Sequence, residues 1–429
     1  MRTFLALLLC ISPSEGFFLN DDRCFGVCSC YSNIDCDRKQ LTAVPTFDLP
    51  VFLLNKDYTH MQTSLGLNDN NITSIPFGAF HNISKLNMPL LSIYLGSNNI
   101  SIIHNGAFTG LESIDDVGIY LDHNQLTTIP LDLTRMTNLF ALDLRYNPIQ
   151  TVSGPVIAAM FASNEITRLS LSSYEMLKKV MEVQDNSLEY LVLDGMTTRK
   201  MDPGLFQRSK TVPLSSITIE KSSFDNVTEV LCNLDLNSLT ISGCPNLGDN
   251  VLQGCPQTSL WRLTIYESNL TNAWTPSALY NSPIRYLTVL GKFDRVPTSV
   301  FRHWPNLQSL TVGSNITIIE KSDFEGLREL HDLNLRANPI HLIADQAFAT
   351  NTKLADLHLH YNNDIHLTSI PSSLQNLTSL SFVELPNMKC TCTAMGGVKG
   401  WHADYVSGQC TNIHMGIGTY IETKLTLCP

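Results

Sequence analysis

The sequence has few charged residues and no cluster of basic ones. Charged side chains make up 16% of the 429 residues, and the formal net charge is -11. Nucleic acids and anionic membranes are bound through clustered lysines and arginines, so this composition argues against both as partners. Hydrophobic residues account for 43% of the chain, which is ample apolar material for a large folded core.

Motifs of the common enzyme classes are also absent. The sequence contains no Gly-x-Ser-x-Gly nucleophile elbow, no phosphate-binding loop and no His-Glu-x-x-His pair. Its polar residues fall on strands expected to form an open sheet, which cannot exclude water as a closed pocket does. We therefore predict a protein that is not an enzyme and that needs no cofactor and no resident metal.

No hydrophobic run is long enough to span a bilayer, which takes roughly 18 or more apolar residues. Near the start, Arg2 precedes an apolar run over residues 4–11, and small residues follow it. This order is typical of a secretory signal peptide. We expect residues 1–16 to be such a peptide and the mature protein to be secreted and extracellular; a membrane anchor is the alternative.

Apolar residues recur at one spacing along most of the chain. The segment Leu90–Phe108 reads LLSIYLGSNNISIIHNGAF. Within it, Ile93 and Leu95 alternate as on a short strand with one buried face, and the other apolar residues close a coil around them. The pattern recurs about fourteen times. The strand pairs are Leu65/Leu67, Ile93/Leu95, Ile119/Leu121, Leu142/Leu144, Leu169/Leu171, Leu191/Leu193, Ile217/Ile219, Leu239/Ile241, Leu263/Ile265, Leu287/Val289, Leu310/Val312, Leu333/Leu335, Leu357/Leu359 and Val383/Leu385.

One such coil cannot bury its apolar face alone, so neighbouring coils must stack. The repeats therefore predict an α/β fold, a right-handed solenoid or horseshoe with parallel strands on its concave face. The expected boundaries are a signal peptide at 1–16, an N-terminal cysteine cap at 17–50, about fourteen repeats at 51–386 and a C-terminal cysteine cap at 387–429.

Cysteines cluster at both ends of the repeat region. The first and last coils each have an apolar face without a neighbour, and disulfides stabilise small caps of this kind in an oxidising compartment. A zinc site is the alternative, and the sequence alone allows three pairings in each cluster. The two clusters are Cys24, Cys28, Cys30 and Cys36, and Cys390, Cys392, Cys410 and Cys428.

Together, the repeats and both cysteine clusters resemble extracellular leucine-rich-repeat proteins with N- and C-terminal cysteine caps, such as Toll-like receptor ectodomains, variable lymphocyte receptors and Slit. The resemblance covers the chain from Cys24 to Cys428. In that family the first cysteine of a cap pairs with the third and the second with the fourth. The resemblance thus implies the disulfides Cys24–Cys30, Cys28–Cys36, Cys390–Cys410 and Cys392–Cys428.

An asparagine follows the strand pair by three residues in several repeats, namely Asn70, Asn98, Asn124, Asn147, Asn315, Asn338 and Asn362. A buried asparagine here can bond the backbone of the next coil and form a ladder. From about residue 160 to 300 other residues take this position, so we expect the ladder to be lost there and the strand register to loosen.

Three further cysteines lie in this middle region. Without Cys10 of the signal peptide the chain has an odd number, which leaves one cysteine outside any disulfide. Cys232 and Cys255 occupy nearly equivalent points of adjacent coils, and stacked strands about 5 Å apart are within reach of a disulfide. We predict a Cys232–Cys255 disulfide, with Cys244 a buried thiol at the ladder position.

Sequons for N-glycosylation suit a secreted glycoprotein. The site at Asn315 is set aside because its side chain should belong to the ladder. The predicted sites are Asn71, Asn82, Asn99, Asn226, Asn269 and Asn376.

Residues beside the strand pairs point to the concave face, because side chains alternate along a strand. Repeats two to four place there aromatic and charged residues of the kind that anchor protein interfaces; a merely solvated face is the alternative. The candidate ligand-binding residues are Tyr94, Tyr120, Asp122, His123, Asp143, Arg145 and Tyr146.

Two other sets share the predicted face. Asp356, His358 and His360 form a second candidate site, for a pH-sensitive protein contact or, as alternatives, a metal ion or an ordinary polar strand end. A row of threonines, called here the threonine stripe, is explained first by the preference of threonine for β-strands. The second interpretation is a groove that binds a sugar or a lipid headgroup. The stripe consists of Thr218, Thr240, Thr264, Thr288 and Thr311.

These observations lead us to expect a recognition protein of innate-immune type. Its partner would be a protein or a microbial surface molecule, with a lipid or glycan possible. The alternatives are an extracellular-matrix, cell-adhesion or guidance ligand that binds host receptors, and a lipid carrier that uses the ladder-poor centre. The repeats share one scaffold and vary their surface, so they do not identify the ligand or the oligomeric state.

Overall fold

The chain folds into two compact units. Unit 1 comprises Met1–Met196 with Gly204–Leu214, and unit 2 comprises Thr197–Pro203 with Ser215–Pro429. The expected signal peptide lies outside the described residues. The computed structural model describes residues 23–24, 27–30, 33–47, 62–85, 88–184, 187–206, 213–232, 234–336, 338–359, 367–401 and 403–428.

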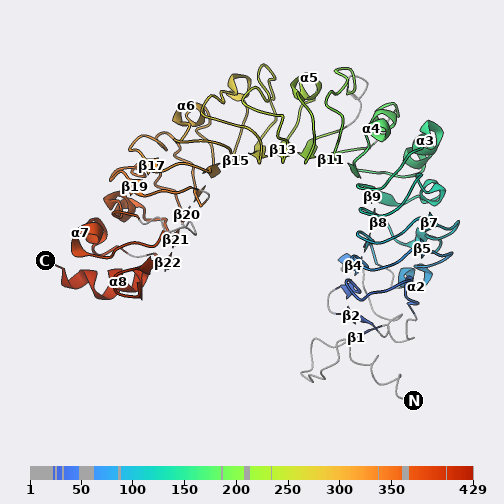
Figure 1. Ribbon diagram of the computed structural model, residues 1–429, viewed down its shortest axis with the longest axis horizontal. Coiled ribbons are helices and arrows are strands. Elements are labelled where there is room, and N and C mark those ends of the chain that lie inside the picture. Colours follow the sequence, from blue (N-terminus) through green and yellow to red (C-terminus); the bar gives the residue numbers. More distant parts are fainter. Residues whose placement is uncertain are drawn as a thin grey trace, which may run out of the picture. The chain divides into compact units, whose positions relative to one another are not determined.

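Unit 1 is a stack of coils, most of which contribute one strand to a parallel sheet. Its helices lie on the side of the coils away from this sheet (Figure 1). The short strands within residues 23–35 pair antiparallel with one another, and those at 74–75 and 102–103 form a separate parallel pair. The strands are β1 (Arg23–Cys24), β2 (Cys28–Cys30), β3 (Ile34–Asp35), β4 (Gln62–Gly66), β5 (Ser74–Ile75), β6 (Leu90–Tyr94), β7 (Ile102–Ile103), β8 (Asp116–Tyr120), β9 (Leu139–Asp143), β10 (Arg168–Leu171) and β11 (Tyr190–Asp194). The helices are α2 (His81–Ser84), α3 (Gly154–Ser163) and α4 (Tyr174–Met181), with 3₁₀ turns at Leu111–Ser113 and Leu131–Thr134.

Unit 2 repeats this arrangement. Its strands are β12 (Ser216–Glu220), β13 (Ser238–Ser242), β14 (Arg262–Tyr266), β15 (Tyr286–Leu290), β16 (Ser309–Gly313), β17 (Ile318–Ile319), β18 (Asp332–Asn334), β19 (Leu342–Ile343), β20 (Asp356–His358), β21 (Phe382–Glu384), β22 (Tyr405–Ser407), β23 (Gln409–Cys410) and β24 (Met415–Gly416). The helices are α5 (Thr228–Leu231), α6 (Thr298–Phe301), α7 (Cys392–Met395) and α8 (Ile417–Thr423). The 3₁₀ turns are Ser277–Leu279, Ser372–Asn376, Gly396–Val398 and Leu425–Leu427. No helix in the described ranges has the length and apolar character needed to cross a bilayer.

The predicted strand pairs form the core. All fourteen pairs are buried, whether both members lie in the strand, as Ile217 and Ile219 do, or the second member follows it, as Leu95 does. Long aromatic side chains fill the space behind the strands, and Trp274 and Trp304 are among the largest fully buried ones. Each coil therefore buries its apolar face against its neighbours, as the repeat spacing predicts.

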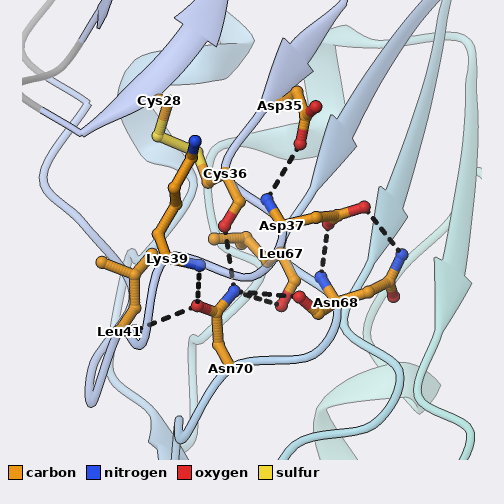
Figure 2. Close-up of a disulfide and its surroundings, with 9 residues drawn as sticks. All are labelled: Cys28, Asp35, Cys36, Asp37, Lys39, Leu41, Leu67, Asn68 and Asn70. Atoms are coloured by element: carbon orange, nitrogen blue, oxygen red, sulfur yellow. Dashed lines mark hydrogen bonds between the residues drawn. A yellow bond between two sulfur atoms is a disulfide. The ribbon is translucent and has the colours of Figure 1, made fainter.

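The asparagine ladder is present where the sequence keeps the asparagine. Asn98 is buried and donates from Nδ2 to the Leu67 carbonyl at 2.9 Å, while its Oδ1 accepts from the Ile72 amide at 3.0 Å. Asn70 makes the first rung, to the Cys36 carbonyl beside the Cys28–Cys36 disulfide (Figure 2). These bonds run to the preceding coil, so the expectation of bonds to the next coil is wrong in direction.

Four ladder-poor strands, β12 to β15, keep an exact register, so the expectation of a loosened register is wrong for these coils. Strands β12 to β15 pair residue for residue; Thr218 faces Thr240, which faces Thr264, which faces Thr288. The irregularity that the structure does show lies between Val117 and Gly118 in unit 1, where the ladder is intact. Buried β-branched pairs and the backbone bonds of the sheet thus hold the register without the asparagines.

Asn315 does not belong to the ladder, and that expectation is also wrong. The stretch from Val312 to the next buried isoleucine, Ile316, is one residue shorter than the stretch from Leu95 to Ile100. In the shortened turn Asn315 is exposed, and the Ser314 hydroxyl donates to the Gly291 carbonyl of the coil before. The reason for setting this sequon aside therefore disappears.

Disulfides close the described parts of both caps and join two central coils. The bonds are Cys28–Cys36, Cys232–Cys255, Cys390–Cys410 and Cys392–Cys428. The side chains of Cys24 and Cys30 lie outside the described part of the chain. Cys244 is fully buried and takes part in none of these bonds; its Sγ lies 3.3 Å from the Ser242 carbonyl.

Candidate functional site

Two tyrosines stack on the strand face of unit 1, the face formed by the side chains that alternate with the buried ones. Tyr94 and Tyr120 are opposite each other in the register of β6 and β8, and their ring centroids are 4.5 Å apart. The Tyr120 ring leans over Gly118, where a Cβ atom would lie 3.0 Å from it. Burial raises the pKa of Tyr120, so the phenol is neutral at physiological pH. The two rings form a pre-arranged aromatic surface.

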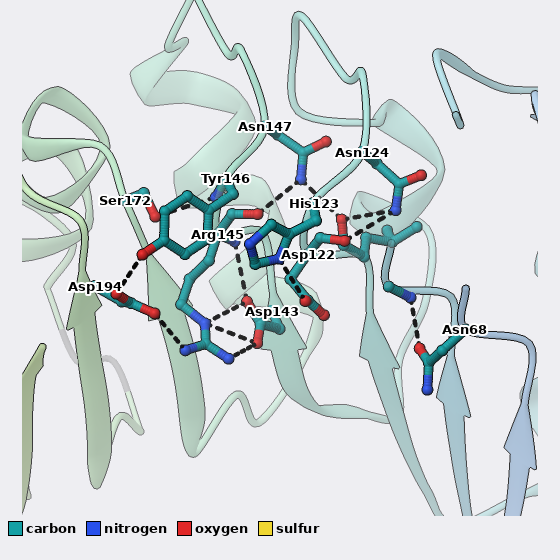
Figure 3. A network of polar contacts seen from close by, with 12 residues as sticks. Asn68, Asp122, His123, Asn124, Asp143, Arg145, Tyr146, Asn147, Ser172 and Asp194 are labelled. Carbon is teal, nitrogen blue, oxygen red and sulfur yellow. Dashed lines mark hydrogen bonds and ion pairs between the residues drawn. The ribbon is translucent and has the colours of Figure 1, made fainter. Parts of the chain in front are cut away.

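Arg145 is the centre of a polar network beside these rings (Figure 3). It follows β9, two residues after Asp143, so both side chains lie on the same face. Its Nε and Nη2 donate to Asp143 at 3.0 and 2.8 Å, and its Nη1 donates to Asp194 at 2.9 Å. The small Ser172 side chain on the coil between them leaves room for the arginine to reach Asp194.

Tyr146 completes the link to Asp194. Its hydroxyl donates to Asp194 Oδ1 at 2.5 Å, and its backbone amide donates to Ser172 Oγ at 3.1 Å. The ring covers Gly195, where a Cβ atom would lie 2.9 Å from the ring. Only a glycine at this position, with its φ of 70°, permits that contact.

His123 and Asp122 form the exposed edge of the network. The His123 Nδ1 lies 3.0 Å from an Asp122 carboxylate oxygen, and the His123 ring stacks on Tyr146 with centroids 4.3 Å apart. Both rings come from residues with a φ of 53°, in the left-handed turn that precedes a ladder asparagine. The turn thereby directs two aromatic side chains onto the strand face.

Burial separates the members of this network into two groups. Asp143 and Asp194 have side chains only 5% and 4% exposed, whereas Asp122 and His123 are 26% and 53% exposed. Burial raises the pKa of Asp143 more than the bonds and charge of Arg145 lower it. For Arg145, burial lowers the pKa, but the hydrogen bonds and charge of Asp143 outweigh it and raise the pKa. The buried carboxylates position Arg145, and the outer residues remain accessible.

The structure brings all seven candidate residues of repeats two to four onto one face, and it adds two. Asp194 and Ser172 were missed, although Asp194 stands beside the pair Leu191/Leu193 as Asp122 stands beside its own. The alternation of side chains along a strand, which selected Asp122, would also have selected Asp194. What the sequence did not reveal is that Arg145 spans two coils, because that contact depends on the small residue between them.

A second cluster lies on the strand face of unit 2. The His358 Nδ1 is 2.9 Å from Glu384, and its Nε2 is 3.6 Å from Asp332. Arg336 also binds Glu384. Asp356 lies opposite Asp332 in the register of β18 and β20, and His360 falls outside the described residues. Glu384 was missed by the sequence analysis, and it is the residue that joins the histidine to the arginine.

Charge pairing favours the ionised form of Glu384. Burial raises the pKa of Glu384, but hydrogen bonds from His358 and Arg336 outweigh it, so the pKa is below its ordinary value. The Phe382 ring lies against His358 at 5.2 Å and stacks on Tyr405 at 4.7 Å. Among the described residues, no group of three histidines, cysteines or acids has a geometry that could hold a metal ion.

The threonine stripe is a continuous row across β12 to β16. Each threonine faces the next one in register, and each is half-buried. Threonine suits this position because its branched side chain packs on a pleated sheet.

Family models match two parts of the chain. A model described as BspA type leucine rich repeat region matches residues 272–393 in six copies, and a leucine rich repeat model matches residues 63–118. The two matches fall in unit 2 and unit 1, on coils whose buried pairs and strands have just been described. The chain is a leucine-rich-repeat protein.

Known proteins with similar sequences match parts of this leucine-rich-repeat protein. Lumican of Gallus gallus is 31% identical over 143 residues, which is 32% of the chain and 38% of lumican. Toll-like receptor 2 of Ovis aries is 32% identical over 90 residues, which is 20% of the chain and 11% of the receptor. The chain thus spans less than two fifths of either relative. Among solved structures, the TLR13–ssRNA13 complex is similar with a TM-score of 0.48 at 18% identity, covering 83% of the chain and 60% of that protein.

Proposed function

We propose that this leucine-rich-repeat protein is a secreted, non-enzymatic recognition protein of innate-immune type, which binds a protein or microbial surface ligand on its strand face. The observation that supports this most directly is the arrangement of unit 1. Buried Asp143 and Asp194 fix Arg145 and Tyr146, and these in turn support an accessible surface. A surface fixed before binding loses little conformational entropy when a ligand binds.

The accessible part of this surface is aromatic and acidic. It consists of the stacked Tyr94 and Tyr120, with Asp122 and His123 beside them. Tyrosines are frequent anchors of protein interfaces, and a half-exposed carboxylate accepts hydrogen bonds from cationic or hydroxyl groups of a ligand. We assign direct contacts to these four residues and a positioning role to Asp143, Arg145 and Tyr146.

Two further features support secretion. Residues 1–16 have the pattern of a signal peptide, and the sequon asparagines Asn71, Asn99, Asn226, Asn269, Asn315 and Asn376 are exposed. Asn71 and Asn99 lie in successive coils, so glycans there would cover one flank and leave the strand face free.

The test is binding of the purified chain to an array of microbial surface molecules and host receptor ectodomains. We expect the variant Tyr120→Ala with Asp122→Ala to lose about tenfold or more in affinity, since truncating an anchor at an interface commonly costs over 1 kcal/mol. Tyr266→Ala, which removes a tyrosine from the strand face of unit 2, is the matched control and should bind normally. Unchanged binding by the double variant would contradict the assigned site.

A second candidate is an extracellular-matrix, cell-adhesion or guidance ligand. The match to lumican, which is longer than the match to Toll-like receptor 2, favours it. This candidate predicts binding to host receptor ectodomains that survives the Tyr120 and Asp122 substitutions. Loss of microbial binding in the same variant would instead support the recognition role.

A further inference from the structure

Two arginines and two aromatic residues alternate on two adjacent strands of unit 2, and none of them belongs to the clusters described above. Arg262 opens β14 and faces Tyr286, which opens β15. The residues just before them, Trp261 and Arg285, are also aligned, because the Arg285 amide donates to the Trp261 carbonyl at 2.9 Å. We call these four residues the Arg262 patch.

Arg262 packs against both rings of the patch. Its guanidinium carbon is 5.2 Å from the Trp261 ring centroid and 4.8 Å from that of Tyr286. The rings themselves meet edge to face with centroids 5.6 Å apart. Cation–π contacts of this kind hold the guanidinium in place while leaving its N–H groups unused.

The patch is exposed and its charge is unpaired. Trp261 is 37% and Tyr286 is 36% exposed, and both arginines are exposed. Within the described part of the chain, neither guanidinium has an ion-pair or hydrogen-bond partner. This is unusual in a protein of net charge -11, where 39 acidic residues outnumber 28 basic ones.

The surroundings keep the patch open. Small serines flank it in the same row of the sheet, Ser238 before Arg262 and Ser309 after Tyr286. The next residue of the row, Asp332, is engaged by the Ser309 hydroxyl at 2.9 Å and by His358. Nothing in the described coils therefore covers or neutralises the two guanidinium groups.

We infer that the Arg262 patch is a second binding surface, which takes a carboxylate-bearing segment of a partner polypeptide. A guanidinium fork binds a carboxylate through two parallel hydrogen bonds, and Arg262 is already oriented by its contacts with the Trp261 and Tyr286 rings. Tryptophan, tyrosine and arginine are the residues that carry most of the binding energy in protein interfaces. The positive patch on an acidic protein complements an acidic partner segment.

The same chemistry disfavours a polyanionic chain as the occupant. Sulfated polysaccharides and nucleic acids bind along extended tracks of basic residues. The row of the sheet that holds the patch has serines on either side and an acid beyond, so the positive surface is local. It matches one or two carboxylates rather than a continuous run of anionic groups.

The experiment uses the fluorescence of Trp261. The other three tryptophans, Trp274, Trp304 and Trp401, are 1%, 1% and 7% exposed, so acrylamide quenching reports mainly on Trp261. We expect a short peptide with two glutamates, Gly-Glu-Glu-Gly with both ends blocked, to protect the purified chain from quenching and to bind with measurable affinity at low salt. The matching lysine peptide, Gly-Lys-Lys-Gly, should give neither effect.

Variants of the patch make the test specific. Arg262→Gln and Arg285→Gln should each weaken the peptide about tenfold, the effect of losing one charge-assisted pair of hydrogen bonds. Arg262→Lys should fall in between, because it keeps the charge but loses the fork. Arg302→Gln, at an exposed arginine just after α6 in the same unit, is the matched control and should bind as the parent does.

Three outcomes would overturn the inference: no binding of the two-glutamate peptide, equal binding by the Arg262 and Arg302 variants, or binding of dextran sulfate in preference to the peptide. The side chains changed are exposed, so circular dichroism should show every variant folded. The patch is separate from the surface of unit 1, and its failure would leave the proposed function untouched.

Discussion

Asn98 shows how one buried side chain joins two coils. Its amide group donates to the carbonyls of Leu67, Leu95 and Gly96 and accepts from the Ile72 amide. At the equivalent position of unit 2, the Ser268 hydroxyl makes a single bond, to the Tyr266 carbonyl of its own turn. The same position of the repeat therefore makes several hydrogen bonds, some of them across coils, when it is Asn98, and one hydrogen bond within its own turn when it is Ser268.

Replacing these two residues measures that difference. Asn98→Ala leaves several buried backbone groups without a partner, so we expect the free energy of unfolding to fall by about 3 kcal/mol. Ser268→Ala should cost less than about 1 kcal/mol, because its hydroxyl bonds only its own turn. Denaturant unfolding of both variants checks this, and equal losses would show that the ladder does not stabilise unit 1.

At the scale of elements, adjacent strands place charged groups in contact across coils. His358 on β20 faces Glu384 on β21, and Arg336, just after β18, reaches the same carboxylate. Glu384 accepts from both, and its pKa is lowered from an ordinary value of 4.5. The ionised Glu384 on β21 therefore links its own strand to β20 and to the end of β18 through hydrogen bonds and ion pairs.

The lowered pKa makes this contribution depend on pH. Because the folded state binds the proton of Glu384 less tightly than the unfolded state, the stabilisation is complete above the ordinary pKa of 4.5 and is lost as pH falls through the lower, folded value. Glu384→Gln should therefore lower the melting temperature of unit 2 at neutral pH, and the difference from the parent should shrink below pH 4.5. A difference that stays constant with pH would contradict the pairing.

At the scale of the whole molecule, each coil contacts mainly its neighbours, so stability is distributed locally. The Cys232–Cys255 disulfide joins two adjacent coils of unit 2 across a sequence separation of 23. Cys244 lies between these two cysteines in the sequence and takes no part in the disulfide. The three central cysteines thus offer a direct comparison of a crosslink with a buried thiol.

Removing the crosslink should have a local effect. We expect Cys232→Ser with Cys255→Ser to cost about 3 kcal/mol and to increase amide hydrogen exchange in β12 to β15. Exchange in β6 to β9 of unit 1 should not change, because solenoid repeats couple to their neighbours. Cys244→Ala is the control, with a smaller effect confined to its own coil. Faster exchange throughout both units would contradict local stabilisation.

The sequence by itself determined the repeat, its buried strand pairs and most of the ladder. These features depend on residue type at fixed spacing within one coil, and every predicted pair from Leu65/Leu67 to Val383/Leu385 is buried. The Cys232–Cys255 disulfide also follows from cysteine position, because stacking brings equivalent points of adjacent coils together. The pairing within the caps followed instead from the resemblance to cysteine-capped leucine-rich-repeat proteins.

Only the tertiary structure decided which polar side chains meet across coils. Arg145 reaches Asp194 because Ser172 between them is small, and Arg262 is held by rings from its own coil and the next. Asn315 leaves the ladder because its turn is one residue shorter. These contacts depend on the register between coils, on the length of a turn or on the size of an intervening side chain. The residue spacing within a single repeat does not reveal them.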